Sequence, residues 1–266
     1  MPTHPIHERI SPSNRSVERA LTILRAFRPG VGRLGNAELA ERTGLARSTV
    51  SRLTQTLAES GFLDYEVATG SYRLGAPVLS LAHALRLDSD VLDFALPVMR
   101  ETAEDHRINV GLAVADQTDM VYLESVRRNR RELFRHVASG SRVPIELTSL
   151  GRAYLSTLSA SARNRLAAQL HSRHQDDWPQ VSAGIEQSLE EARLGGYCAV
   201  SWQAGITSIA SPLGLPELPP YVFNISYATG DFTRRKADTT LVPLLLDLVQ
   251  RVRAEFGGGA RALMGR

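Results

Sequence analysis

The 266-residue sequence has one cysteine and no long apolar run, and each absence excludes a class of protein. A single cysteine, Cys198, cannot form an intrachain disulfide or supply a multi-cysteine zinc site. The richest apolar stretch, Leu241 to Val249, is interrupted by a proline and an aspartate and is too short to cross a bilayer. Residues 1–19 are polar and lack the apolar core of an export signal. We therefore expect a soluble, cytoplasmic protein that makes no membrane contact.

Lysine is also nearly absent, since Lys236 is the only one among 31 basic residues. Two explanations of this preference for arginine are open. One is the base composition of the genome, and the other is a need for planar, multi-donor contacts to phosphate, carboxylate or guanine. With 28 acidic residues, the formal net charge is +3. Residues 1–76 hold ten arginines and seven acidic residues, whereas residues 77–266 are balanced. The excess therefore lies in the first 76 residues, where we look for a polyanionic partner.

The periodicity of apolar residues predicts a small N-terminal domain and a larger α+β domain. In the first part we expect a helix capped by Ser16 and ended by Pro29, helices at 36–43 and 47–60, and strands at 62–65 and 71–74. In the second part we expect strands at 108–114, 120–126, 133–137, 199–202, 206–210 and 221–227, and helices at 97–106, 150–158, 162–170, 181–194 and 237–256. The predicted organisation is a disordered tail at 1–14, domains at 15–76 and 92–257, a linker helix at 77–91 and a flexible tail at 258–266.

Gly30, Gly32 and Gly35 have the spacing of a dinucleotide-binding loop, but their surroundings exclude one. The phosphate-binding loop follows a strand and requires an acidic residue about 20 positions later. Here a helix is predicted before the glycines, and Thr54-Gln55-Thr56 occupies the later position. We interpret the stretch as a flexible loop between helices.

Residues 36–55 have the residue types of a helix-turn-helix at the spacing that this motif requires. A small residue, Ala40, is placed where the two helices cross, and Gly44 occupies the turn, where a positive φ favours glycine. The outer face of the second helix then carries the candidate DNA-binding residues Arg47, Ser48, Thr49, Ser51 and Arg52. The hairpin that follows is a wing with two further candidates, Tyr72 and Arg73, although Arg73 is equally compatible with a solvated strand. A generic helical hairpin is the alternative interpretation.

Other constellations point to no catalysis. His171 and His174 beside Asp176 and Asp177 suggest a metal site, but solvated polar residues are the simpler interpretation. The sequence has no nucleophile elbow, carboxylate pair or zinc spacing, so we expect no enzyme activity, no metal and no cofactor. The arginine-rich run at 127–131 is a solvated hairpin tip, a subunit contact or a second nucleic-acid patch, and we favour the first.

Short motifs spread in order over residues 16–256 resemble those of IclR-type bacterial transcriptional regulators. In the N-terminal part they are Ser16-Val17-Glu18-Arg19-Ala20-Leu21, Ala37-Glu38-Leu39-Ala40, Gly44-Leu45-Ala46-Arg47-Ser48-Thr49-Val50, Gly61-Phe62-Leu63 and Thr69-Gly70-Ser71-Tyr72-Arg73-Leu74-Gly75. In the C-terminal part they are Val143-Pro144, Thr148-Ser149-Leu150-Gly151-Arg152-Ala153, Gly195-Gly196-Tyr197 and Gly205-Ile206-Thr207-Ser208-Ile209-Ala210-Ser211-Pro212.

The resemblance implies a winged helix-turn-helix, a linker helix that helps dimerisation, and a GAF-like effector-binding domain. The implied partners are palindromic double-stranded operator DNA, a second copy of the chain in a homodimer or dimer of dimers, and a small effector, commonly an organic or aromatic acid from a catabolic pathway. Matched onto this sequence, the effector pocket comprises Ser149, Leu150 and Gly151, with Ser208, Asn224 and Ser226.

One departure from the family pattern bears on the effector. Many members have an acidic cluster and two more residues between the positions of Gly196 and Gly205, whereas this chain has only residues 197–204 there. An acidic effector then meets less repulsion, so we expect a carboxylate. Trp202, as an apolar or stacking wall, and Cys198 join the candidate effector-binding residues, although both are also ordinary core residues. The alternative hypothesis is a GAF-like sensor or enzyme whose N-terminal module serves dimerisation.

Overall fold

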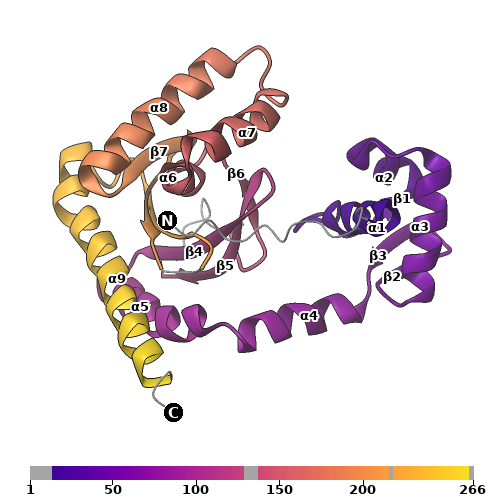
Figure 1. The fold of residues 1–266 in the computed structure, drawn as a ribbon, viewed down its shortest axis with the longest axis horizontal. Coiled ribbons are helices and arrows are strands. Elements are labelled where there is room, and N and C mark those ends of the chain that lie inside the picture. Colours follow the sequence, from indigo (N-terminus) through magenta and orange to yellow (C-terminus); the bar gives the residue numbers. More distant parts are fainter. Residues whose placement is uncertain (1–13, 129–136, 216–217, 264–266) are drawn as a thin grey trace. The chain divides into compact units, whose positions relative to one another are not determined.

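The computed structural model describes residues 14–128, 137–215 and 218–263, and it divides into two compact units, Met1–Ser89 and Asp90–Arg266 (Figure 1). The expected tail at 1–13, most of the expected strand at 133–137, and Arg130 and Arg131 of the arginine-rich run lie outside the described residues.

The N-terminal unit combines a helix-turn-helix with a small antiparallel sheet of order β1-β3-β2. Its elements are α1 (Arg15–Arg25), β1 (Leu34–Gly35), α2 (Asn36–Thr43), α3 (Arg47–Glu59), β2 (Leu63–Glu66), β3 (Ser71–Leu74) and α4 (Ala76–Leu87). Buried side chains from α1, α2, α3 and the sheet form one core, in which Ile23, Leu39 and Val50 are fully buried. The predicted helix pair and wing hairpin are confirmed.

Two local predictions in this unit are wrong. The cap of α1 is Asn14 rather than Ser16, because the Asn14 side chain accepts hydrogen bonds from the backbone N–H groups of Ser16, at 3.0 Å, and Val17. The glycine stretch at 30–35 is not all loop, because Leu34 pairs with Tyr72 across β1 and β3 and buries its side chain.

The linker helix α4 has none of its residues buried. Its predicted apolar side is largely exposed, with Leu79 at 75% and Leu81 and Leu85 each at 61%. Helix formation itself is explained by Pro77 in the first turn, where its missing N–H costs nothing. An apolar face of this kind is typical of a surface that another chain covers.

The C-terminal unit is built on one six-stranded sheet of order β6-β5-β4-β9-β8-β7. Its elements are α5 (Asp90–His106), β4 (Asn109–Asp116), β5 (Asp119–Arg127), β6 (Arg142–Pro144), α6 (Ser149–Thr157), α7 (Ala160–His171), α8 (Trp178–Gly195), β7 (Cys198–Gln203), β8 (Ile206–Leu213), β9 (Tyr221–Ala228) and α9 (Arg234–Leu263). All neighbouring strands are antiparallel. The mixed α+β class is confirmed.

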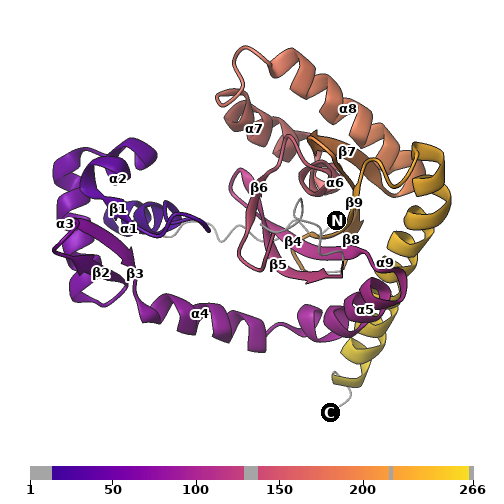
Figure 2. The same cartoon turned by 180° about the vertical axis from the view of Figure 1, so that it is seen from behind.

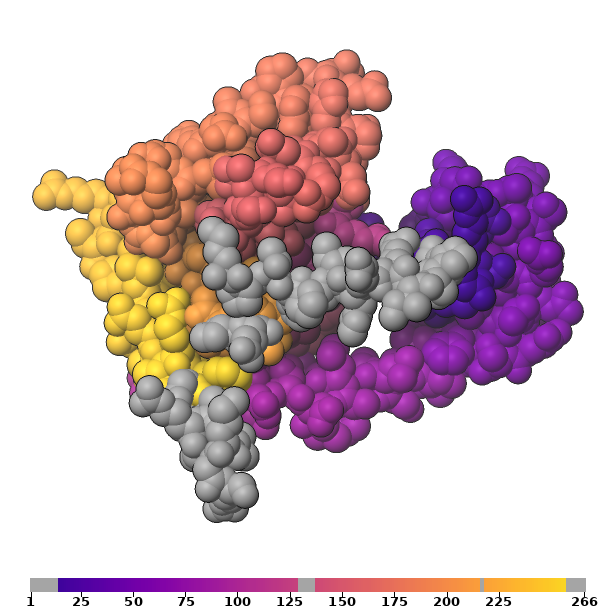
Figure 3. Space-filling model, viewed as in Figure 1, coloured from indigo at the N-terminus to yellow at the C-terminus, as the bar shows by residue number. Residues whose placement is uncertain are grey.

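Helices cover both faces of this sheet, as Figures 1 and 2 show from opposite sides. Helices α5 and α9 pack on one face and bury Phe223 and Ile225 of β9. Helices α6, α7 and α8 cover the other face, and α7 and α8 form its outer surface in Figure 3. Because side chains alternate along a strand, Asn224 and Ser226 between these apolar residues face α6. The face of the sheet toward α6 therefore has polar positions on β9.

Two further differences from the expected elements concern β6 and α9. Strand β6 was not predicted, because it is three residues long and contains a proline. Helix α9 continues to Leu263, so residues 258–263, expected in a flexible tail, are helical. Within the described residues, no helix is both long enough and apolar enough to span a membrane.

The turn between α2 and α3 requires a left-handed residue, since Gly44 has a φ of 68°. A methyl group added there contacts nothing within 4 Å, so the cost of Gly44→Ala is the backbone strain alone. We expect this substitution to lower the free energy of unfolding by about 1 kcal/mol.

Chemical denaturation followed by far-ultraviolet circular dichroism measures this effect, because both tryptophans lie in the C-terminal unit. Gly32→Ala is the matched control, since Gly32 has no positive φ and also has open space around it. Equal stability of the two variants would contradict the prediction.

Candidate functional site

A cavity of about 230 Å³ lies against the face of the sheet that α6 covers. Six of the eight predicted effector residues line it: Ser149, Leu150, Trp202, Ser208, Asn224 and Ser226. The remaining wall comprises Tyr122, Val137, Ser141, Arg142, Val143, Thr148, Gln203 and Ile206. Five of these residues lie on β5, on β6 or between these strands, and no sequence spacing indicates that they approach α6. The other three, Thr148, Gln203 and Ile206, are close in sequence to predicted effector residues.

The first turn of α6 supplies backbone donors to this cavity. Thr148 is the N-cap, and its side-chain oxygen accepts a hydrogen bond from the Gly151 N–H at 3.2 Å. The N–H groups of Ser149 and Leu150, both on the cavity wall, belong to a first helical turn, where no acceptor exists within the helix. Such a turn favours an anionic or strongly polar group beside it.

Gly151 and Cys198 are close to the cavity but do not line it. A Cβ on Gly151 would lie 2.0 Å from the carbonyl oxygen of Ile145, so this glycine permits a backbone contact rather than a ligand contact. Cys198 is fully buried, and its thiol donates to the Ser149 carbonyl oxygen at 3.4 Å. Burial raises the pKa of the Cys198 thiol to about 12. Cys198 is therefore a neutral core residue that supports the start of α6.

Three polar side chains on β8 and β9 form a hydrogen-bonded group in the cavity wall. The Asn224 Nδ2 donates to Ser208 Oγ at 2.9 Å and to Ser226 Oγ at 3.0 Å. Ser226 Oγ donates to Ser208 Oγ, and Ser208 Oγ donates to the Ile225 carbonyl oxygen, each at 3.3 Å. Tyr122 lies on the same wall, and burial raises the pKa of its phenol to about 12. This part of the wall, on β5, β8 and β9, is thus polar and uncharged at neutral pH.

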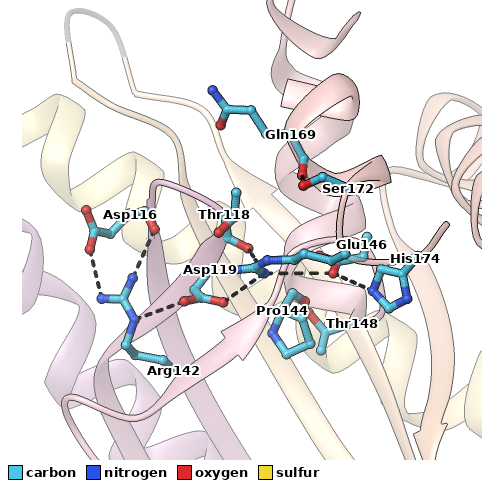
Figure 4. Close-up of polar contacts among 11 residues, drawn as sticks. Asp116, Thr118, Asp119, Arg142, Pro144, Glu146, Thr148, Gln169, Ser172 and His174 are labelled. Atoms are coloured by element: carbon cyan, nitrogen blue, oxygen red, sulfur yellow. Dashed lines mark hydrogen bonds and ion pairs between the residues drawn. The ribbon is translucent and has the colours of Figure 1, made fainter. Parts of the chain in front are cut away.

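Arg142 is the charged residue of the cavity wall, and carboxylates already surround it (Figure 4). Its Nη1 lies 2.8 Å from Asp116 Oδ2, and its Nε lies 3.1 Å from Asp119 Oδ2. Asp119, with a side chain 5% exposed, also contacts Arg173 Nη1 at 3.4 Å. Arg142 therefore brings little uncompensated charge to the cavity.

The same network continues to the segment that precedes α6. Glu146 is buried, and its Oε1 lies 2.8 Å from His174 Nε2 and 3.9 Å from Arg173 Nη1 (Figure 4). These contacts join β5, β6 and the residues after α7. They explain His174, which sequence reasoning interpreted as solvated and which instead pairs with a buried carboxylate. Among the described residues, no cluster of three or more potential ligands could hold a metal.

Arg152 attaches the first part of α6 to α8. Its Nε donates to the Glu146 carbonyl oxygen at 3.0 Å, and its Nη1 donates to the Gly184 carbonyl oxygen at 2.8 Å. Burial lowers the pKa of Arg152, but the guanidinium stays charged because its ordinary pKa is so high. Arg152 thus connects the start of α6 both to the segment that precedes this helix and to α8.

The outer face of α3 presents the other predicted site. Arg47, Ser48, Ser51 and Arg52 are exposed and Thr49 is half-buried, whereas Val50, Leu53 and Leu57 point into the core. Gln55 lies on the same exposed face, four residues after Ser51, and sequence reasoning missed it. Helical periodicity alone could have identified it.

The two predicted wing residues, Tyr72 and Arg73, differ in their exposure. Tyr72 is 8% exposed and packs against Tyr65 with ring centroids 4.9 Å apart, because β3 turns this side chain into the core. Arg73 is exposed but pairs with Asp64 at 3.3 Å across the hairpin. The other wing pair, Arg33 with Glu66 at 2.9 Å, is similarly neutralised. The wing therefore offers less free positive charge than α3.

Comparison with known families assigns both units. The IclR helix-turn-helix domain matches residues 16–66, and the bacterial transcriptional regulator IclR C-terminal domain matches residues 84–254. The HTH-type transcriptional regulator TsaQ1/TsaQ2 of Comamonas testosteroni is 28% identical over 245 residues, which cover 91% of this chain and 88% of that protein.

Solved structures have the same architecture. An IclR family transcriptional regulator from Brucella abortus superposes with a TM-score of 0.85 at 29% identity, covering 95% of this chain and 96% of its own. An IclR homolog from Microbacterium hydrocarbonoxydans, solved with 4-hydroxybenzoate, superposes with a TM-score of 0.68 at 19% identity, covering 91% and 99%. The second likeness, at this low identity, concerns the fold alone.

The network around Asp119 should stabilise the segment that carries the cavity wall. We expect Asp119→Asn to lower the free energy of unfolding by about 3 kcal/mol, because it removes the carboxylate shared by two arginines in a mostly buried setting. Asp64→Asn, which breaks the exposed pair with Arg73, should cost less than about 1 kcal/mol.

Denaturation followed by tryptophan fluorescence measures the first variant, and circular dichroism measures the second. A cost for Asp119→Asn as small as that of the exposed pair would show that the network contributes no special stability.

Proposed function

The chain belongs to the IclR family of bacterial transcriptional regulators, and we propose from this premise that a small, carboxylate-bearing aromatic or other organic acid occupies the cavity beside α6 and changes operator binding by α3. The family assignment supplies the DNA-binding and effector-binding domains. The class of ligand, the residues that bind it and the regulation of a catabolic operon are the proposal.

The cavity at the start of α6 is the observation that carries this proposal. Its volume of about 230 Å³ exceeds the roughly 150 Å³ of an engineered cavity that binds benzene, but it is below the range of drug-sized sites. A single substituted ring therefore fits, whereas a fused or extended ligand does not. Trp202, at 37% exposure, supplies an aromatic side chain on the wall.

Two features favour an acid over a base as the ligand. The N–H groups of Ser149 and Leu150 favour a negative group, and no acidic side chain lines the cavity among the described residues. The charge of Arg142 is compensated by ion pairs with Asp116 and Asp119. We therefore assign the ligand's carboxylate to the helix start rather than to this arginine. The 4-hydroxybenzoate bound to the Microbacterium homolog supports the same class.

The DNA-binding surface that we propose is the exposed face of α3. Arg47 and Arg52 have no ion-pair partner among the described residues and extend from a face of short hydroxyl side chains. Such a face approaches the major groove closely, and a free arginine can hold guanine through two hydrogen bonds. The exposed leucines of α4 support a homodimer, which would read the two halves of a palindromic operator.

A proline substitution tests the helix-start site at the level of one N–H group. Ser149 is the first residue of α6, where proline is tolerated, and the extended conformation of Thr148 suits a following proline. We expect Ser149→Pro to weaken benzoate binding about tenfold, because one charge-assisted hydrogen bond is lost. Uncharged benzamide should be affected much less.

Ser149→Ala is the control, since it keeps the N–H and removes only the hydroxyl. Isothermal titration calorimetry gives the affinities, and circular dichroism checks that both variants fold. Unchanged benzoate affinity in Ser149→Pro would rule out this position for the carboxylate.

A pair of arginine substitutions tests the DNA surface. We expect Arg47→Ala and Arg52→Ala each to weaken binding to the chain's operator at least about tenfold, with a smaller dependence of affinity on salt if the lost contact is to phosphate. Arg165→Ala removes the same charge from an exposed position of α7 and should leave affinity nearly unchanged.

Fluorescence anisotropy with a duplex selected from random DNA by the protein itself provides the measurement. If both α3 variants bind that duplex like the wild type, the N-terminal unit does not read DNA through this face, and its role as a dimerisation module becomes the better hypothesis.

A further inference from the structure

A second, smaller cavity of about 30 Å³ adjoins the ligand cavity. The two share wall residues Tyr122, Val137, Asn224 and Ser226. A cavity of roughly 10–15 Å³ on this scale is enough for one water molecule. This side chamber is therefore large enough for one small substituent of a ligand, such as a hydroxyl, and too small for a ring.

Gly111 keeps the side chamber open. It lies opposite Asn224 in the pairing of β4 with β9, and both residues line the chamber. A Cβ on Gly111 would lie 2.4 Å from Asn224 Oδ1 and 2.5 Å from Tyr122 Cε1. The absence of a side chain thus leaves the Asn224 carbonyl group and the Tyr122 ring edge facing one confined space. The other polar residues that line this space are Asn109, Ser125, Arg127 and Ser226.

Asn224 places an unsatisfied acceptor on the wall of this chamber. The residue is 3% exposed, and its Oδ1 has no hydrogen-bond partner among the described residues. The neighbouring serines do not satisfy it, because Ser226 donates its proton to Ser208 and Ser208 donates to a backbone carbonyl. The hydrogen bond between Tyr122 and the Asn224 side chain does not use Oδ1 either. A buried acceptor without a donor carries a substantial free-energy cost, so the site favours any group that brings a donor to it.

We propose that the ligand of this chain carries a small hydrogen-bond donor, a hydroxyl or an amino group, that enters the side chamber and donates to Asn224 Oδ1. This inference rests on the proposed function, since it concerns a second group on the same acid. The carboxylate lies at the start of α6, and the donor lies at the Gly111–Asn224 side. Asn224 thereby selects among aromatic acids of similar size.

Matched pairs of ligands test the proposal on the wild-type protein. Benzoate, its 3-hydroxy and 4-hydroxy derivatives, and the corresponding fluorobenzoates are titrated by calorimetry. We expect one hydroxybenzoate to bind about tenfold more tightly than benzoate and than its own fluoro analogue, because fluorine is close to a hydroxyl in size but cannot donate. If neither hydroxy compound exceeds benzoate, or if the fluoro analogue binds equally well, the proposal is wrong.

Substitution of Asn224 then identifies the residue responsible. Asn224→Leu keeps the branched shape and the number of side-chain heavy atoms but has no polar atom, so it should bind benzoate and the preferred hydroxybenzoate with nearly equal affinity. Asn164→Leu, at an exposed position of α7, is the matched control and should keep the preference. A preference that survives in Asn224→Leu would overturn the assignment to Asn224. If that variant does not fold, the wild-type ligand series still decides the proposal.

These measurements distinguish failure of the proposed ligand class from failure of the proposed donor to Asn224. If no benzoate derivative binds to the wild-type protein, the proposed ligand class is wrong and the donor proposal falls with it. If benzoate binds and depends on the Ser149 N–H but a hydroxyl adds nothing, the ligand class stands and only the donor proposal is excluded.

Discussion

The contact between Gly151 and the backbone of Ile145 determines where a ligand can bind in this molecule. A Cβ at Gly151 would lie 2.2 Å from the Ile145 Cα, so only glycine lets residues 145–148 fold back against α6. This fold brings Thr148 into the capping position and leaves two N–H groups on the cavity wall. Arg152 and Cys198 stabilise the helix start by hydrogen bonds to the carbonyl oxygens of Glu146 and Ser149, respectively.

The charged side chains around this contact stabilise the structure, whereas uncharged groups face the ligand cavity. Arg142 and Arg173 are held in a network of carboxylates, in which Glu146 and Asp119 are nearly inaccessible (Figure 4). What the cavity presents is a helix start, a hydroxyl and amide group on β8 and β9, and aromatic side chains. These groups bind a ligand through hydrogen bonds in a confined space, so affinity depends strongly on where the ligand carries its donors and acceptors. A small site gains its selectivity in this way.

Local patterns predicted the DNA-binding unit more fully than the effector unit. The crossing residue Ala40, the turn at Gly44 and the exposed face of α3 all follow from spacing within 20 residues, which a helix pair converts directly into geometry. The orientation of the wing residues could not be predicted, because the sequence of a four-residue strand does not reveal which of its faces is buried. Tyr72 was predicted to face DNA, but its side chain is buried. The sequence predictions named six of the fourteen residues that line the cavity. They could not separate Gly151 and Cys198 from those six, because the roles of these two depend on neighbours at 2.0 Å and 3.4 Å.

By itself the sequence determined the order of most helices and strands, the family and the position of the positive charge, because these properties are encoded in periodicity, motif order and composition. Only the tertiary structure decided that Arg142 is neutralised, that His174 meets a buried carboxylate, and that Asn224 keeps an unpaired oxygen beside Gly111. Each of these facts depends on the pairing of segments that are distant in the chain, and no local pattern of residues contains that information.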